Sequence, residues 1–249
     1  MNGYSSVEEE FDEKASSYEN NRLSSWYKSQ GEIILNVLEP YQYGTILDIG
    51  CGTGWFLRQV LKAHPQLEGI GIDLSGRMID VARQKAKEEN LHNITFYKGE
   101  WESLHLTVNG INLESKPIRL IVCISAFHYF NDPFSAAKLI YRCLRNNGHF
   151  FLLDREREKS FFTSIWDVLH KTMVRDHVRF YRSTDLQSIL EAAGFMDVQI
   201  MSKINKYFWR RKLFTSLVLL SARKLVKDFS APSLSIEKKL QPFERGKHE

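Results

Sequence analysis

The sequence is poor in cysteine and has no long hydrophobic run. Its three cysteines, Cys51, Cys123 and Cys143, lie far apart and form no CxxC pair, so neither a disulfide framework nor a zinc ribbon is expected. We expect reduced thiols in a cytoplasmic protein. The longest apolar stretches, at 120–127 and 217–220, are too short to span a bilayer. The acidic N-terminal stretch lacks the apolar core of a secretory signal.

Internal repeats and low-complexity linkers are also absent. Of the 249 residues, 43% are hydrophobic and 26% are charged, which is ordinary for a globular chain and excludes wholesale disorder. This length suits one large α/β domain. The net charge is +4, but residues 200–249 carry +8 and the remainder −4. The basic segment is either a solvated strand edge with a tail or a surface for an acidic partner.

Strand-like and helix-like periodicity alternate along the chain. Helices are predicted over 7–39, 55–63 and 76–89, from Pro133 to near Gly148, and from Thr184 to Gly194; strands are predicted from Thr45 and over 68–74, 93–99, 118–127, 149–154, 197–209 and 213–224. Asp132 is expected to cap one helix, Thr184 and Gln187 to form a capping box, and Gly194 to end its helix. This alternation predicts a doubly wound parallel sheet with helices on both faces, closed by an antiparallel strand. Such sheets bind ligands at the carboxyl ends of their strands.

A glycine-rich segment, Asp48-Ile-Gly-Cys-Gly-Thr-Gly54, follows the first of these strands and opens a helix. Its glycines remove side chains where a ligand must approach the backbone, and the helix start presents free amide donors. Asp73 ends the next strand, 19 residues after Gly54. A carboxylate at this distance can accept hydrogen bonds from the hydroxyls of a ribose. The two features together indicate a cofactor that contains a nucleoside.

The motifs LDIGCGTG, GIDLS, GEWESL and CISAFHYFNDP occur in this order over residues 47–133. In this respect the chain resembles the class I S-adenosylmethionine-dependent methyltransferases, and within them the small-molecule branch that includes quinone-biosynthesis enzymes. The resemblance covers roughly residues 11–224. The GxGxG spacing differs from the dinucleotide pattern GxGxxG, which disfavours a nicotinamide oxidoreductase.

The resemblance implies S-adenosylmethionine as cofactor, with a seven-stranded Rossmann-like sheet and an N-terminal helical lid. It assigns the methionine part of the cofactor to Asp48 and the Gly50-Cys51-Gly52 backbone, and the ribose to Asp73. It places Leu74, Met78, Glu100 and Trp101 around the adenine, Ser125 at the sulfonium end, and Tyr18 above the cofactor. We expect a single domain, 1–226, made of a lid (1–40), a cofactor-binding core (41–154), an acceptor cover (155–182) and closing elements (183–226), followed by a flexible tail (227–249) that lacks periodicity.

Methyl transfer requires alignment more than a catalytic triad, and the sequence contains no strong candidate for a triad. His128 follows the fourth parallel strand, and a histidine suits proton removal near neutral pH. The alternative is a histidine that shapes the pocket or satisfies a backbone group. Of its neighbours Phe127 and Tyr129, one is expected to belong to the core.

The segment from Arg155 to Tyr181 mixes aromatic and cationic residues, which fits a cover over a small aromatic or anionic acceptor. The alternative is an amphipathic helix on the sheet with its charges in solvent. His170 and His177 are seven residues apart, too far for a helical metal pair, and no metal site is expected. Arg179 and Arg182 can pair with a carboxylate or phosphate, or serve as surface charges.

Three functions fit these observations. The first is methyl transfer to a small molecule, with O, N, C and S acceptors all open. The second is methyl transfer to RNA or another nucleic acid, suggested by the basic C-terminal residues but disfavoured because Ser125-Ala-Phe-His128 stands where such enzymes carry an NPPY-type segment. The third is a cofactor-binding protein without catalysis. The oligomeric state is left open.

Overall fold

The computed structural model of the chain describes residues 3–20, 24–38, 44–103, 107–108, 111–156, 179–204 and 216–225. Most of the acceptor cover expected over 155–182 lies outside these ranges, including His170 and His177. The tail expected over 227–249 also lies outside them. The predictions for these two segments therefore stay predictions.

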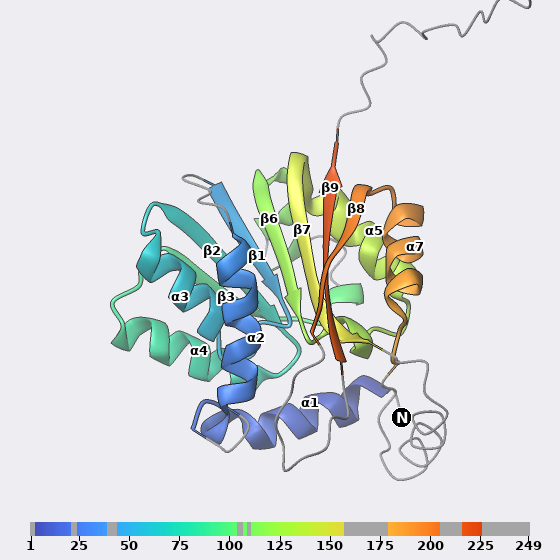
Figure 1. The fold of residues 1–249 in the computed structure, drawn as a ribbon. Coiled ribbons are helices and arrows are strands. Elements are labelled where there is room, and N and C mark those ends of the chain that lie inside the picture. The colour runs from blue at the N-terminus through green and yellow to red at the C-terminus, as the bar shows by residue number, and fades with distance from the viewer. Residues whose placement is uncertain are drawn as a thin grey trace, which may run out of the picture.

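Seven strands form one sheet in the order β3-β2-β1-β6-β7-β9-β8. Their bounds are β1 Gly44–Ile49, β2 Leu67–Asp73, β3 Ile94–Lys98, β6 Ile118–Ile124, β7 Leu144–Glu156, β8 Met196–Ile204 and β9 Ser216–Lys224. β1 pairs in parallel with β2 and β6, while β9 runs antiparallel to both β7 and β8 (Figure 1). The predicted Rossmann-like sheet with an antiparallel C-terminal strand is confirmed. The direction of winding changes at β1, which places the ligand-binding edge near β1 and β6.

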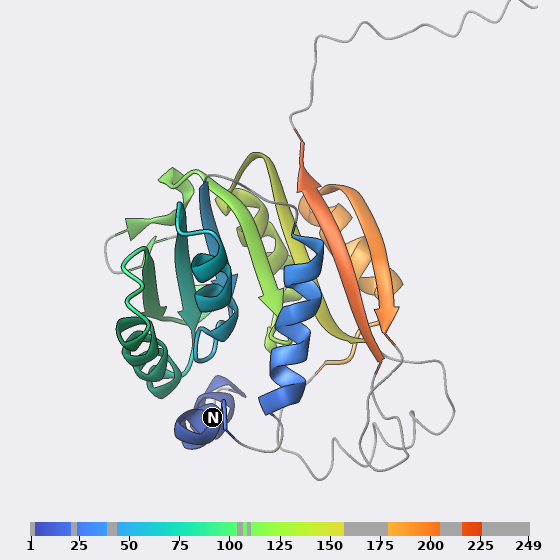
Figure 2. The same ribbon diagram turned by 60° about the vertical axis from the view of Figure 1, so that its left-hand side comes forward.

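Helices lie on both faces of this sheet (Figure 2). Their bounds are α1 Gly3–Lys14, α2 Ser24–Val37, α3 Trp55–Ala63, α4 Gly76–Glu88, α5 Pro133–Cys143 and α7 Ser183–Ala193. Four short 3-10 turns, η1 Ala15–Ser17, η2 Trp101–Ser103, η3 Leu113–Ser115 and η4 Phe127–Tyr129, and a small hairpin, β4 Thr107–Val108 with β5 Ile111–Asn112, complete the described elements. α1 lies across the carboxyl ends of the parallel strands (Figure 1).

The hydrophobic core has two layers because successive strand residues point to opposite faces. Leu120 and Val122 of β6 pack with α2, α3 and α4 on one face. Ile121 and Cys123 of the same strand pack with α5 and α7 on the other face. The near-continuous apolar pattern of this strand thus reflects burial on both sides, which holds the strand ends rigidly in place.

The N-terminal helix differs from the prediction of one helix over 7–39. α1 ends at Lys14, the 3-10 turn η1 follows, and α2 begins only at Ser24. Serine and asparagine residues, which compete with helical hydrogen bonds, cluster between the two helices. The break allows α1 to lie across the strand ends while α2 packs on the sheet.

Three further boundaries differ from the prediction. The strand predicted over 118–127 ends at Ile124, because Ser125 takes a left-handed φ of 52° and the turn η4 follows. The helix expected to reach Gly148 ends at Cys143, where an extended Leu144 begins β7. The predicted Thr184 capping box is wrong: α7 begins at Ser183, and the Arg182 backbone N–H donates to the Asp185 carboxylate.

Two predicted helix caps are confirmed. The Asp132 carboxylate accepts from the Ser135 backbone N–H at 3.1 Å, and Pro133 occupies the first turn of α5. Gly194 ends α7 with a left-handed φ of 109°. Both caps belong to helices that pack on the same face of the sheet.

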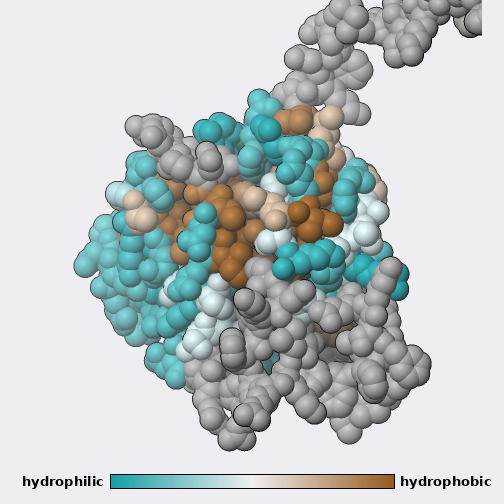
Figure 3. Space-filling view, in the orientation of Figure 1, coloured by the Kyte–Doolittle hydropathy of each residue, from teal (hydrophilic) through white to brown (hydrophobic). Residues whose placement is uncertain are grey.

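Hydrophobic residues gather over the middle of the face shown in Figure 3, and hydrophilic residues surround them. Met196, Ile200 and Met201 of the edge strand β8 are exposed large hydrophobic residues. Among the described residues, no helix combines the length and apolar character that a membrane span requires. The polar groups described below lie elsewhere, at the carboxyl ends of the parallel strands.

Candidate functional site

The glycine loop after β1 makes a tight turn that opens onto a cavity. Gly50, Gly52 and Gly54 have left-handed φ values of 74°, 54° and 72°. A Cβ atom on Gly50 would lie 2.3 Å from the Ala126 Cβ, whereas on Gly52 its nearest neighbour would be Tyr18, at 3.9 Å. The loop therefore packs tightly at Gly50 and leaves open space above Gly52, as a backbone cradle for a ligand would.

Asp73 ties this loop to the end of β2. Its Oδ2 accepts from the Gly52 backbone N–H at 2.7 Å, and its Oδ1 accepts from the Ser75 backbone N–H at 2.9 Å. Burial raises the pKa of Asp73 to about 6, against these two bonds, which lower it. A carboxylate has about four acceptor sites, so Asp73 keeps lone pairs for ligand hydroxyls.

Asp48, near the end of β1, is a buried acid that lacks a complete set of partners. Its side chain is only 2% exposed, and its Oδ1 has no hydrogen-bond partner among the described residues. Burial, followed by the nearby charge of Asp73, raises the pKa of Asp48 to about 8. An unpaired buried carboxyl is costly, so this position fits a ligand that brings a cationic or N–H group.

The neighbouring wall comes from the loop after β2 and from the end of β3. Leu74 and Met78 line the cavity beside Glu100 and Trp101. The Trp101 indole Nε1 donates to the Ala136 carbonyl oxygen at 3.2 Å, which fixes the ring in the core. Burial also raises the pKa of the Cys51 thiol, so this side chain is a small uncharged part of the wall. A flat, largely apolar group fits between such side chains.

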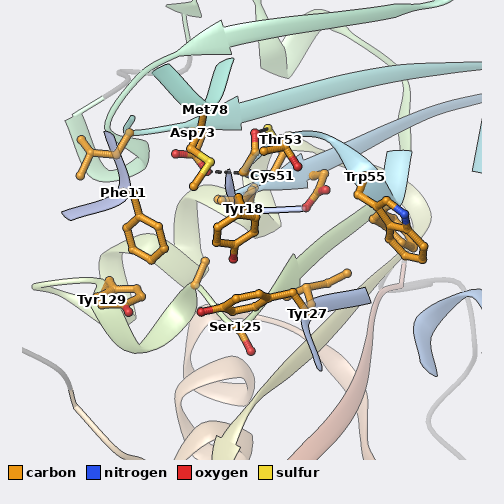
Figure 4. A pocket seen from close by; sticks show the side chains of 18 of the residues that line it. Phe11, Tyr18, Tyr27, Cys51, Thr53, Trp55, Asp73, Met78, Ser125 and Tyr129 are labelled. Atoms are coloured by element: carbon orange, nitrogen blue, oxygen red, sulfur yellow. Dashed lines mark hydrogen bonds between the residues drawn. The ribbon is translucent and has the colours of Figure 1, made fainter. Parts of the chain in front are cut away.

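The N-terminal segment covers the cavity. The Tyr18 ring stacks on Tyr27, with ring centroids 4.4 Å apart, and lies between Asp73 and Tyr27 in Figure 4. Burial raises the pKa of the Tyr18 phenol far above its usual range, so its hydroxyl stays neutral. Phe11 of α1 contacts Tyr129 edge-on at the other end of the view (Figure 4).

Two polar contacts hold this cover in place. The Asp12 carboxylate accepts from the Ser75 hydroxyl and from the Arg77 backbone N–H at the start of α4. The Glu19 Oε1 accepts from the Thr53 hydroxyl and from the buried Arg58 guanidinium, both at 2.6 Å. The cover is thus attached to the glycine loop itself and to the helices that flank it.

The ends of β6 and β7 supply the remaining polar wall. The His128 Nδ1 lies 2.6 Å from the Asp154 Oδ1, and the His128 backbone N–H donates to the Asp154 Oδ2 at 3.0 Å. Both side chains are buried, and the His128 Nε2 has no partner among the described residues. Beside them, the Ser125 hydroxyl donates to the buried Gln30 Oε1 of α2. The expectation that one neighbour of His128 is core holds for Phe127, while Tyr129 lines the cavity.

The structure brings all of the predicted site residues to the wall of a single cavity of about 170 Å³: Tyr18, Asp48, Gly50, Cys51, Gly52, Asp73, Leu74, Met78, Glu100, Trp101, Ser125 and His128. Gln30 and Asp154 were not predicted as site residues, and Arg155 was predicted only as part of the acceptor cover. Asp154 and Arg155 follow a buried strand, so the rule that sites lie at strand ends could have found them. Gln30 lies on a helix far away in sequence and carries no such signal.

The residues present fit an S-adenosylmethionine molecule. The unpaired Asp48 Oδ1 suits its cationic end, and the open space above Gly52 suits its close approach to the backbone. The remaining lone pairs of Asp73 suit the two hydroxyls of a ribose.

Comparisons with known proteins agree with this geometry. A family model described as a methyltransferase domain matches residues 20–200. The uncharacterized methyltransferase YcgJ of Bacillus subtilis is 30% identical over 159 residues, which cover 62% of this chain and 58% of YcgJ. Demethylmenaquinone methyltransferase of Bacteroides fragilis is 27% identical over 223 residues, which cover 78% of this chain and 85% of that protein. The chain spans less than two thirds of the length of YcgJ and of two further relatives.

Solved structures share the fold. The crystal structure of YcgJ superposes with a TM-score of 0.64 at 20% identity, over 80% of this chain and 99% of that chain. Phosphoethanolamine N-methyltransferase 2 of Haemonchus contortus, solved with phosphomonomethylethanolamine and S-adenosylhomocysteine, superposes with a TM-score of 0.69 at 16% identity, over 86% of this chain and 58% of that chain. With the family model matching most of its length, the chain belongs to the methyltransferase domain family, and its resemblance to the class I S-adenosylmethionine-dependent methyltransferases is confirmed.

Proposed function

We propose that this enzyme transfers the methyl group to a small-molecule acceptor and that His128 accepts the proton which the acceptor loses. The observation that carries the proposal is the pairing of the His128 Nδ1 with Asp154 while its Nε2 is left without a partner at the cavity wall. Support for a small acceptor comes from the cavity, which a lid covers, and from relatives whose names state small-molecule substrates.

In this proposal the residues from β1, β2 and β3 hold the cofactor. Asp48 faces its cationic methionine end, and the Gly50-Cys51-Gly52 backbone lies alongside. Asp73 accepts from the ribose hydroxyls. Leu74, Met78, Glu100 and Trp101 enclose the adenine, and Tyr18 covers the cofactor from the lid. The carboxylates on this side complement a cofactor that carries positive charge.

When bound, S-adenosylmethionine supplies a methyl group on a sulfonium sulfur, which leaves as a neutral thioether. The protein has to hold the acceptor atom in line with that methyl group and to exclude water. Phe11 and Tyr18 of the cover exclude water from above. Ser125, at the end of β6, donates to Gln30, and in this proposal it would line the sulfonium end of the cofactor.

His128 then acts as a general base. In the neutral imidazole, the Nδ1–H donates a hydrogen bond to the Asp154 carboxylate, which selects the tautomer whose Nε2 is an acceptor. As the acceptor forms its bond to the methyl carbon, its O–H or N–H proton passes to Nε2. Asp154, buried beside the ring, stabilises the positive charge that the imidazole gains.

We further propose that the reaction takes place in the cytoplasm. The three cysteines are buried and free, which suits a reducing compartment.

Tracing the methyl group tests the proposed function. The enzyme is incubated with S-adenosylmethionine labelled in its methyl group and with a cell extract that contains both metabolites and RNA, and the products are separated into small molecules and nucleic acid. We expect label in a small molecule with the wild-type enzyme and little with the His128→Asn variant. Label in the RNA fraction alone would reject the small-molecule assignment, and equal labelling by the variant would reject the role of His128.

A further inference from the structure

The cavity has a second polar wall whose hydrogen-bonding groups are incomplete. Gln30 Nε2, His128 Nε2 and Arg155 Nε are buried atoms without a hydrogen-bond partner among the described residues. All three residues line the cavity. They come from α2 and from the carboxyl ends of β6 and β7. The residues proposed for the cofactor come from β1, β2 and β3, on the other side of the sheet order.

The contacts of each group show whether it can donate a hydrogen bond to a ligand or accept one. The Gln30 Oε1 accepts from the Ser125 hydroxyl, so the Gln30 Nε2 is a free donor. The Arg155 Nε is a second donor, and its guanidinium lies 5.5 Å from the centroid of the Trp26 ring. The His128 Nε2 is an acceptor, because the His128 Nδ1 faces the Asp154 carboxylate. A ligand that completes this wall must carry oxygen acceptors for Gln30 and Arg155 and one proton donor for His128.

Acidic and basic side chains also lie on different sides of the cavity. Asp48, Asp73 and Glu100 line the side of β1 to β3, whereas Arg155 lines the side of β7. Lys28 also faces the cavity, but its Nζ already donates to the Glu19 carbonyl oxygen at 3.2 Å. Among the described residues that line the cavity, Arg155 is therefore the cation that is best placed to bind a negative charge on the acceptor.

We propose that Gln30, Arg155 and Trp26 form a subsite for an anionic acceptor, namely a hydroxylated carboxylic acid. Arg155 and Gln30 bind its carboxylate, Trp26 packs beside its carbon skeleton, and its hydroxyl donates to the His128 Nε2. The subsite rests on the proposed function for the role of His128. It adds the class of compound that the enzyme selects.

Matched pairs of probes test this subsite. Salicylate, protocatechuate and caffeate are each compared with their neutral primary amides, which keep the hydroxyl groups and lose the charge. Binding to the complex of the full chain with S-adenosylhomocysteine is measured by calorimetry and by ligand-observed NMR. We expect at least one acid to bind about tenfold or more tightly than its amide, the fold-change of one charge-assisted hydrogen bond.

Variants test whether the preference for the acids over the amides depends on Arg155. Arg155→Met should bring the ratio of acid to amide affinity close to one and leave the affinity for S-adenosylhomocysteine unchanged, which also shows that the variant is folded. Arg155→Lys should keep part of the preference. Arg145→Met removes the same charge from an exposed position on β7 and should keep all of it.

The outcomes separate the subsite from the proposed function. Amides that bind as well as the acids, or a preference that survives in Arg155→Met, would overturn the anionic subsite. If the amides are also methylated and this methylation depends on His128, the proposed function is supported and only the anionic subsite is rejected. If neither acids nor amides bind to the complex, the anionic subsite is rejected, and labelling of RNA alone in the tracing experiment would reject the proposed function.

Discussion

The Asp154 carboxylate lies directly behind His128, with one oxygen 2.6 Å from the imidazole Nδ1 and the other 3.0 Å from the backbone nitrogen of the same residue. One carboxylate thus fixes both the ring and the turn that carries it. The other ring nitrogen, on a residue that lines the cavity, has no partner among the described residues, as a base for methyl transfer requires.

His128→Asn should lower kcat by a factor of about 10²–10⁴, the usual contribution of a general base. The affinity for S-adenosylhomocysteine should not change, because His128 lies outside the residues proposed for the cofactor. His92→Asn, at an exposed position, is the control and should leave kcat unchanged. Added imidazoles should restore activity to His128→Gly in proportion to their basicity. A His128→Asn enzyme with normal kcat would contradict the assignment.

Asp154→Asn should lower kcat through His128, as expected of a positioning residue. The loss should be smaller for acceptors with a more acidic hydroxyl, because these need less help from a base. A residue that only stabilises the fold would lower kcat equally for all acceptors. Steady-state kinetics with a series of acceptors of graded acidity distinguishes these results.

Asp73→Ala should weaken cofactor binding by about 1.5–3 kcal/mol, the range for hydrogen bonds to a charged group. The variant loses the proposed ribose contact and also the acceptor that orients the Gly52 N–H. Calorimetric titration with S-adenosylhomocysteine measures the change. The control Asp80→Ala removes a carboxylate that is 77% exposed and should bind normally. Unchanged affinity in a folded Asp73→Ala protein would reject the ribose assignment.

Gly52→Val should block the cofactor site. The backbone at Gly52 has a left-handed φ of 54°, and a side chain would enter the open space below Tyr18. A β-branched residue is strained in this conformation, and its methyl groups would occupy the cradle. Gly76→Ala is the matched control, because its Cβ atom would meet nothing closer than 3.4 Å. Normal cofactor affinity in Gly52→Val would show that the loop is misplaced.

Asp48 should make stability depend on pH. Its folded pKa, about 8, lies above the unfolded value of about 3.9, so the folded state binds more protons between these values. The free energy of unfolding should therefore fall as the pH rises through this window. Asp48→Asn should remove the slope above about pH 6, because Asp73, whose pKa is also raised to about 6, contributes mainly below that value. Urea denaturation of both proteins at several pH values measures it, and identical slopes would contradict the assigned pKa shift.

The same ionisation should couple to the cofactor. A cationic ligand favours the ionised form of Asp48. Affinity for S-adenosylmethionine should therefore rise with pH up to about 8 in the wild-type protein and change less in Asp48→Asn. Titrations in buffers of different ionisation enthalpy detect the proton that is released on binding. No release in the wild-type protein would contradict this coupling.

Glu19→Gln should destabilise the fold by about 1.5–3 kcal/mol, since it weakens hydrogen bonds to a charged group. Arg58 is almost fully buried and depends on Glu19 and Glu89 for its pairing. Asp80→Asn is the control, because the Asp80–Arg83 pair is exposed and worth roughly 0.5 kcal/mol or less. Urea denaturation measures both variants. Equal stability of the two would show that the buried contact does not hold the cover.

The sheet and the gathering of the predicted site residues at one cavity could be predicted from the sequence because both follow from local patterns. Buried strands appear in the sequence as apolar runs. The site residues after β1 and β2 directly follow such runs, so their position at the strand ends could be predicted. The break between α1 and α2 was missed because propensity along 7–39 is helical on both sides of it. Gln30 was missed because its role arises from packing of α2 against the end of β6, which tertiary structure decides.

Calorimetric titration of the purified protein with S-adenosylmethionine, S-adenosylhomocysteine and NAD in parallel tests the central claim most directly. The account predicts saturable binding of the first two compounds at one site per chain and no binding of NAD. Binding of NAD, or binding of none of the three by folded protein, would contradict the assignment of this cavity.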